Sequence, residues 1–116
     1  MKDFNFEVVH LGINQTNQED AKKVADLFQD LFGFSETNTP ISIFSSPKIE
    51  IMKKKGAGEC GHVAIGTSNI TEAKKYLESK GVQFDPGTAV YTEAGKLKLI
   101  YLKNEIGGFA IHLIQK

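Results

Sequence analysis

The sequence contains no arginine, and all 14 basic residues among its 116 positions are lysine. Arginine is the usual residue for holding a phosphate or carboxylate through two parallel hydrogen bonds, so its absence argues against proteins that depend on such a grip. The lysines are balanced by 14 acidic residues. A chain with no net charge has no overall field to attract nucleic acid or an anionic membrane, so we expect neither as a partner.

Cysteine and long apolar runs are also scarce. The single cysteine, Cys60, excludes an internal disulfide and is typical of a reducing compartment. No segment approaches the roughly 20 consecutive apolar residues of a membrane span. We therefore expect a cytoplasmic protein. Cys60 shares the strand face of His62 and could look into a pocket, but an inert thiol at the start of a strand is the favoured interpretation.

One phrase occurs twice in the sequence. INQTNQEDAKK, residues 13–23, returns as IGTSNITEAKK, residues 65–75, at a constant offset of 52 residues that also aligns HLGI with HVAI. Two copies indicate two related modules, because a solenoid needs more copies of a shorter period. We predict a single domain, 1–116, with module one at about 6–54 and module two at about 60–116, joined through KKKGAGECG.

Each module is predicted to contain a strand, a helix and three further strands. Asn17 and Asn69 precede periodic apolar segments that end at Gly33 and Gly81, which is typical of capped helices packed on one side. In module one, Ala21, Val24, Ala25, Phe28, Leu31 and Phe32 form the expected apolar side. The predicted strands cover residues 8–13, 34–38, 41–45, 48–53, 62–66, 82–91, 97–103 and 109–115.

Strand alternation places every histidine of the chain on one kind of face. In four of the strands one face is aliphatic, whereas the other carries one ionisable residue beside small neighbours such as Gly12 and Ala64. These ionisable residues are His10, Glu50, His62 and His112. Burying them without a partner is costly, and three imidazoles with a carboxylate suit one divalent ion such as Zn, Ni, Co, Mn or Fe. We predict a metal site formed by these four residues.

The doubled plan, with HLGI, IEIM, GHVAI and EIGGFAIHL at the ligand-bearing strands, resembles the vicinal oxygen chelate superfamily over essentially the whole chain. This superfamily includes glyoxalase I, methylmalonyl-CoA epimerase, extradiol dioxygenases, fosfomycin-resistance transferases and bleomycin-resistance proteins. The resemblance implies an α+β fold of two βαβββ modules, with curled mixed sheets around a central cavity. It also implies metal ligands at His10, Glu50, His62 and His112, the last standing where the family usually has Glu.

The resemblance implies a metal-dependent lyase or isomerase of glyoxalase type. Such an enzyme would chelate two adjacent oxygens of a small oxo or hydroxy-carbonyl substrate, with Glu50 as the one remaining carboxylate base. Dioxygenase chemistry fits less well, because the usual final Glu is absent. The alternatives are a non-catalytic, drug-binding protein and an accessory partner of a sugar-acid aldolase, since the segment GKLKLIYLKNEIGGFAIHLIQK resembles a domain that is fused to some aldolases.

The resemblance also implies a homodimer, and it leaves open whether the metal site lies within one chain or between two. Two further groups of residues have alternatives. Lys53, Lys54 and Lys55 either line the mouth of the site and attract an anionic substrate or form a solvated strand end, which is favoured. Tyr91 and Tyr101 either donate a phenol to the substrate or pack at an edge, and packing is preferred.

Overall fold

The structure, a computed structural model, describes residues 4–116 and contains two helices and eight strands in that range. Module one comprises β1 (Glu7–Asn14), α1 (Gln18–Phe32), β2 (Glu36–Asn38), β3 (Ser42–Ser45) and β4 (Ile49–Met52). Module two comprises β5 (Gly61–Thr67), α2 (Ile70–Ser79), β6 (Phe84–Tyr91), β7 (Leu97–Leu102) and β8 (Phe109–Gln115). The predicted order of strand, helix and three strands, written twice, is confirmed.

Both helices begin at the asparagines that the sequence indicated. The side chain of Asn17 accepts a hydrogen bond from the backbone N–H of Asp20, and Asn69 does the same for Glu72. These bonds satisfy amides that would otherwise have no partner in the first turn. Helix α1 ends at Gly33, whose φ of 74° is the left-handed conformation that glycine adopts freely. No helix in residues 4–116 is long and apolar enough to cross a membrane.

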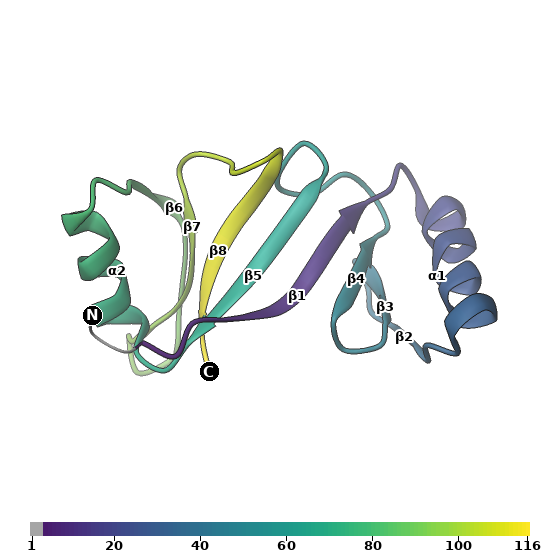
Figure 1. The fold of residues 1–116 in the computed structure, drawn as a ribbon, viewed down its shortest axis with the longest axis horizontal. Coiled ribbons are helices and arrows are strands. Elements are labelled where there is room, and N and C mark those ends of the chain that lie inside the picture. Colours follow the sequence, from purple (N-terminus) through teal and green to yellow (C-terminus); the bar gives the residue numbers. More distant parts are fainter. Residues whose placement is uncertain (1–3) are drawn as a thin grey trace.

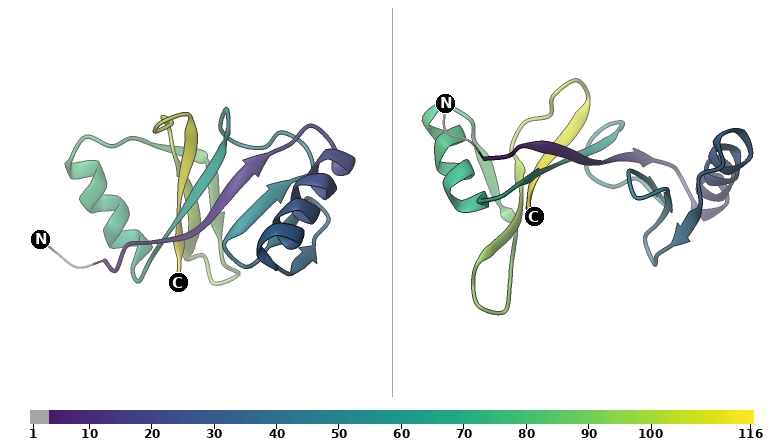
Figure 2. Two further views of the ribbon diagram at one scale, coloured as in Figure 1. Left: turned by 45° about the vertical axis from the view of Figure 1, so that its right-hand side comes forward. Right: turned by 60° about the horizontal axis from the view of Figure 1, so that its bottom comes forward.

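The two modules share one sheet. Its strand order is β2-β3-β4-β1-β5-β8-β7-β6, so the first strands of the two modules are neighbours at its centre. β1 and β5 pair antiparallel, whereas β1–β4 and β5–β8 are parallel pairs. Figure 1 shows these central strands running between helices at opposite ends of the molecule, and Figure 2 shows the β6–β7 hairpin bending away from them.

Each helix packs on its own apolar core, on the same side of the sheet. Helix α1 contributes Ala21 and Ala25 to a cluster with Ile43 and Ile51. Helix α2 and its neighbouring strands form a second cluster, with Ile70, Ala73, Ile100 and Leu113 at its centre. These strand residues alternate with Glu50 and His112, so the predicted site lies on the opposite, helix-free face.

The helix α1 face is narrower than its apolar pattern predicts. Ala21 and Ala25 are fully buried, but Leu31 and Phe32 are 61% and 62% exposed. The expectation that both pack in the core is therefore wrong. Helix α1 contacts the short strands β2–β4 through Ala21 and Ala25, whereas the Phe32 ring meets Phe28 and Phe34 outside the buried cluster.

Candidate metal centre

Two rows of side chains cross the centre of the helix-free face. One row, set by the strand registers, runs Glu50, Gly12, His62, Ala110 across β4, β1, β5 and β8. The next runs His10, Ala64, His112, Tyr101 across β1, β5, β8 and β7. A small residue therefore separates Glu50 from His62 in the first row and His10 from His112 in the second, where Tyr101 follows His112 directly. This spacing leaves room for the His62 ring over Gly12.

Gly12 shows how tight this arrangement is. A Cβ atom built at this position would lie 2.0 Å from Cε1 of His62, far inside van der Waals contact. The imidazole of His62 therefore occupies the space that any side chain at position 12 would need. Gly12 is required here for its lack of a side chain, since its φ lies outside the positive range.

The four predicted ligands meet within one chain. Nε2 of His10 lies 3.1 Å from Nε2 of His62, and Glu50 Oε1 lies 3.4 Å from the first and 3.2 Å from the second. A ring nitrogen of His112 completes the group of imidazoles, whose nitrogens all lie within 4.8 Å of one another. The candidate site thus takes His10 and Glu50 from module one and His62 and His112 from module two of the same chain.

The short distances among these atoms are explained better by one shared metal ion than by hydrogen bonds between the side chains. If both Nε2 atoms donate to Glu50, the 3.1 Å contact between them sets two N–H groups against each other. An ion with bonds of about 2.0–2.2 Å places neighbouring donor atoms about 2.9–3.5 Å apart in tetrahedral or octahedral geometry. The distances between Glu50, His10 and His62 fall in this range. The donor set and its spacing therefore suit a divalent ion.

Glu50 is held in its charged form. Burial raises the pKa of this carboxyl, but hydrogen bonds from His10, His62 and Ser42 outweigh it, so the pKa lies well below its usual range. The Ser42 hydroxyl donates to Oε2 at 2.7 Å, leaving Oε1 toward the imidazoles. Ser42 thus fixes which carboxylate oxygen faces the site, the role that outer partners of metal ligands commonly have.

His112 is the most deeply placed of the strand β8 side chains on this face. It is 3% exposed, and burial lowers its pKa to about 4, with smaller contributions from the nearby imidazoles. The ring is therefore neutral at physiological pH. A neutral imidazole is the form that binds a metal ion.

Tyr101, for which the sequence left a substrate-facing phenol as the less favoured alternative to edge packing, lies beside the cluster. Its ring centroid is 4.9 Å from that of His112, and its pKa is raised by burial and by the charge of Glu50. The phenol therefore keeps its proton and can donate a hydrogen bond toward the site. Strand parity alone leaves its position open, because the face of Tyr101 becomes known only when β7 is known to pair with β8 in this register.

Other sequence candidates lie outside the cluster. Cys60 is exposed immediately before β5, and the interpretation of an inert thiol stays a prediction. Lys53 donates to the backbone carbonyl of Thr39 at 2.6 Å, so at least one of the three consecutive lysines is tied to the β2–β3 turn. Tyr91 is exposed, on the strand at the far edge of the sheet.

Comparisons with known proteins find similarity in structure alone. No protein-family model and no curated protein matches the chain. A selenomethionine form of methylmalonyl-CoA epimerase superimposes with a TM-score of 0.68 at 16% identity, covering 99% of this chain and 98% of the other. The epimerase from Mycobacterium tuberculosis gives 0.63 at 18% identity, covering 93% and 86% of the two chains.

A third epimerase structure, a Streptomyces coelicolor variant in complex with 2-nitronate-propionyl-CoA, gives a TM-score of 0.66 at 13% identity, covering 94% of this chain and 96% of the other. The chain has the fold of the methylmalonyl-CoA epimerases. The predicted resemblance to the vicinal oxygen chelate superfamily and its glyoxalase-like α+β fold is thereby confirmed at the level of the fold. At sequence identities this low, the likeness to the epimerases shows a shared fold and no more.

Proposed function

We propose that the chain is a divalent-metal-dependent isomerase or lyase of glyoxalase type, acting on a small carbonyl compound with two adjacent oxygens. The observation that carries the proposal is the convergence of His10, Glu50 and His62 at separations that suit one ion, with a nitrogen of His112 within 4.8 Å of the other two imidazoles. His10, Glu50, His62 and His112 would hold the metal. When bound, the metal would polarise the substrate oxygens and stabilise negative charge beside the carbonyl.

Glu50 is proposed as the proton acceptor. Within residues 4–116 it is the carboxylate that pairs with His10 and His62, and it is charged. The Ser42 hydroxyl bonds to one of its oxygens and holds the carboxylate in place. A base that touches the site and keeps a fixed orientation meets the geometric requirement for removing a proton next to a carbonyl.

The presence of one carboxylate favours proton transfer between neighbouring atoms on one side of the substrate. Inverting a carbon centre requires a proton acceptor and a proton donor on opposite sides, and beside the Ser42 hydroxyl, which is bonded to Glu50, the Tyr101 phenol is the protic group next to this cluster. We therefore infer the substrate class from the site residues of this chain and not from the substrate of its structural neighbours. Epimerisation of methylmalonyl-CoA is the activity for which the structural neighbours are named.

Metal content is the first test of this proposal. Tag-free protein purified without chelators is expected to contain close to one divalent ion per chain by elemental mass spectrometry. Glu50→Gln should lower metal content or retention, whereas Glu59→Gln alters an exposed carboxylate near the start of β5 and should leave it unchanged. A chain that stays metal-free after reconstitution with Zn, Ni, Co, Mn and anaerobic Fe(II) would contradict the proposal and favour the metal-free binder.

Turnover is tested separately, by NMR detection of deuterium uptake from solvent next to the carbonyl of 2-oxo and 2-hydroxy-carbonyl compounds. Metal-loaded wild type should catalyse the exchange, and Glu50→Gln should not. Metal binding without exchange on any of these compounds would remove the catalytic part of the proposal. Association with a sugar-acid aldolase stays a prediction, which co-elution of the two proteins in gel filtration would check.

A further inference from the structure

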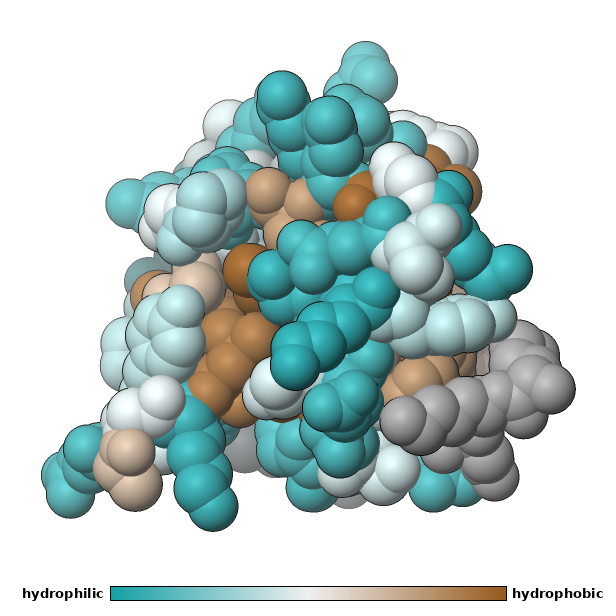
Figure 3. All heavy atoms as spheres, turned by 90° about the vertical axis from the view of Figure 1, so that its left-hand side faces the viewer, coloured by the Kyte–Doolittle hydropathy of each residue, from teal (hydrophilic) through white to brown (hydrophobic). Residues whose placement is uncertain are grey.

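A second cavity lies at the opposite end of module two from the metal cluster. It has a volume of about 1030 Å³ and is bounded by α2 on one side and the β6–β7 hairpin on the other. None of His10, Glu50, His62 or His112 lines it. Figure 3 shows apolar side chains at the bottom of a hollow between polar ridges on this end of the molecule. The cavity is therefore distinct from the proposed catalytic site.

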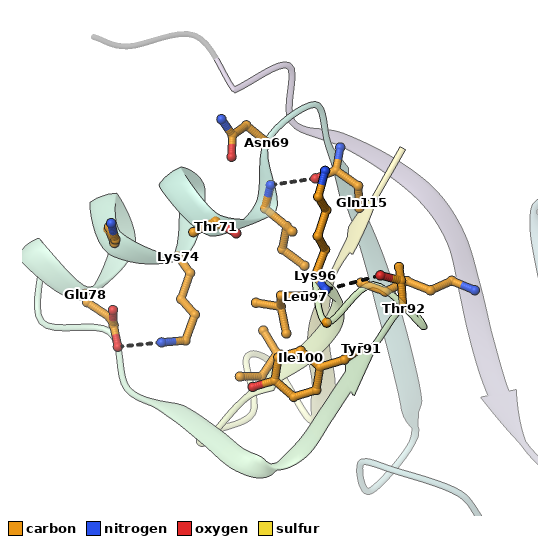
Figure 4. Close-up of a pocket in the computed structure, with 14 residues that line it drawn as sticks. Asn69, Thr71, Lys74, Glu78, Tyr91, Thr92, Lys96, Leu97, Ile100 and Gln115 are labelled. Carbon is orange, nitrogen blue, oxygen red and sulfur yellow. Dashed lines mark hydrogen bonds and ion pairs between the residues drawn. The ribbon is translucent and has the colours of Figure 1, made fainter.

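The inner wall of this cavity is apolar. Ile70 and Ile100, each 2% exposed, lie at its floor as part of the buried core under α2, and Leu97 is partly buried against the same core. The Tyr91 ring, 61% exposed, stands beside Ile100 and Leu97 in Figure 4. An aliphatic floor with one exposed aromatic wall favours the flat or aliphatic body of an organic ligand over a bare inorganic ion.

The rim of the cavity carries excess positive charge. Its ionisable lining residues are Lys74, Lys75, Lys96, Lys98 and Glu78. Glu78 pairs with Lys74 at 3.0 Å, and Glu72 lies 3.9 Å from Lys75, so both lysines of α2 have a carboxylate partner. Within residues 4–116, Lys96 and Lys98 have no carboxylate partner within ion-pair distance. The free positive charge therefore lies on the side of the β6–β7 hairpin.

The lysines on the two sides of the cavity differ in whether they are paired with a carboxylate. In Figure 4 the Lys74 ammonium turns toward Glu78 near the C-terminal end of α2, whereas Lys96 extends along the opposite side, near Gln115. Gln115 itself is occupied, because its Oε1 accepts a hydrogen bond from the backbone N–H of Ile70 at 2.9 Å. Lys96 thus presents an unpaired ammonium beside an apolar floor. The charge pattern suits a ligand with an apolar body and one anionic end.

We propose that this cavity binds an amphipathic organic anion, whose apolar body lies on Leu97, Ile100 and Tyr91 and whose carboxylate or phosphate group is held by Lys96, with Lys98 nearby. The volume accommodates a molecule of drug or metabolite size. Because no arginine is present, the anionic end is held by point charges, and both carboxylate and phosphate remain acceptable.

The proposal is tested by titrating 15N-labelled full-length protein with 1-naphthyl phosphate and with 1-naphthoate, following amide shifts by NMR. Saturable shifts at residues 91–100 and at Ile70 are expected for at least one of the two compounds, and the comparison identifies the preferred anionic group. Inorganic phosphate should bind more weakly because it lacks the apolar body, and the neutral 1-naphthalenemethanol should bind more weakly because it lacks the anionic group.

Lys96→Glu should weaken binding of the preferred compound by about tenfold or more through charge reversal. Lys48→Glu makes the same change at an exposed lysine of the β3–β4 turn and should leave binding unchanged. Circular dichroism and thermal unfolding confirm that both variants fold. The proposal is overturned by the absence of saturable shifts, by shifts centred on the metal cluster, or by equal binding to Lys96→Glu and wild type. Metal content is independent of all these outcomes.

Discussion

At the scale of single residues, Gly12 provides the sharpest test of the site. Gly12→Ala would place a methyl group where the His62 ring lies, so we expect the ring to move and metal affinity to fall by about tenfold or more. Isothermal titration with Zn measures this effect. Gly56→Ala is the matched control, because its new Cβ would meet only ordinary contacts of 3.5 Å or more. Equal affinity in the two variants would show that His62 does not bind the metal.

Two buried serines on strand β3 give a second residue-scale prediction. Ser42 donates to Glu50, whereas the Oγ of Ser45 has no hydrogen-bond partner in the described chain. Ser42→Ala should lower metal affinity by about tenfold, since Glu50 loses the bond that orients it. Ser45→Ala removes an unsatisfied hydroxyl and should leave metal affinity unchanged while keeping or slightly raising stability. A Ser42→Ala variant with wild-type affinity would remove Ser42 from the site.

At the scale of elements, the caps explain why two short helices form where they do. Asn69→Ala deprives the Glu72 amide of its acceptor at the start of the ten-residue α2. We expect a loss of about 1 kcal/mol in the free energy of unfolding, measured by urea denaturation. Asn104→Ala changes an exposed asparagine in the β7–β8 connection and should cost much less. Equal losses would mean that the cap bond does not stabilise the helix.

Much of the element order could be predicted from the sequence, because the caps and the alternation of apolar residues are local signals. The convergence of His10, Glu50, His62 and His112 on one face also followed from strand parity, although metal binding by them stays a prediction. Two features could not be predicted. Pairing of β1 with β5, and of Tyr101 with His112, depends on contacts between distant segments. The exposure of Leu31 depends on how far the β2–β4 strands reach under α1.

At the scale of the whole molecule, the two cores are joined mainly through the central strands. Cluster residues of α1 and α2 do not overlap, and the site takes two side chains from each module across the β1–β5 pair. A bound ion would therefore connect the modules. We expect metal at about 100 times its Kd to raise the free energy of unfolding by about 2.7 kcal/mol, reversed by a chelator. Thermal unfolding that is insensitive to metal and chelator would contradict this.

The chain is more extended than a typical monomer of its mass, which favours the predicted homodimer. Its accessible surface is 7190 Å² for 12.8 kDa, against about 6,300 Å² for a typical monomer of that mass, and its radius of gyration is 15.2 Å against about 13 Å. Exposed apolar side chains gather on α1, at Leu27, Leu31 and Phe32. Sedimentation velocity should report a dimer of the wild type.

Leu31→Glu is expected to shift this dimer toward monomer, because it places a charge in the exposed apolar group of α1. Lys23→Glu introduces the same side chain at an exposed polar position of the same helix and should leave the dimer intact. A monomeric wild type at tens of micromolar would contradict the homodimer, and a dimeric Leu31→Glu variant would exclude this face of α1.

The two halves of the site correspond to each other across the central β1–β5 pair. His10 corresponds to His62, Gly12 to Ala64, and Glu50 to His112. Two separate, identical modules would be bound by rotational symmetry to offer the same ligand twice. Joining them in one polypeptide lets each copy vary independently. At the last pair of corresponding positions the modules differ, with the anionic Glu50 in module one and the neutral His112 in module two. The two sides of the site therefore differ in charge, so they could orient a substrate bound between them, which a symmetric pair could not do.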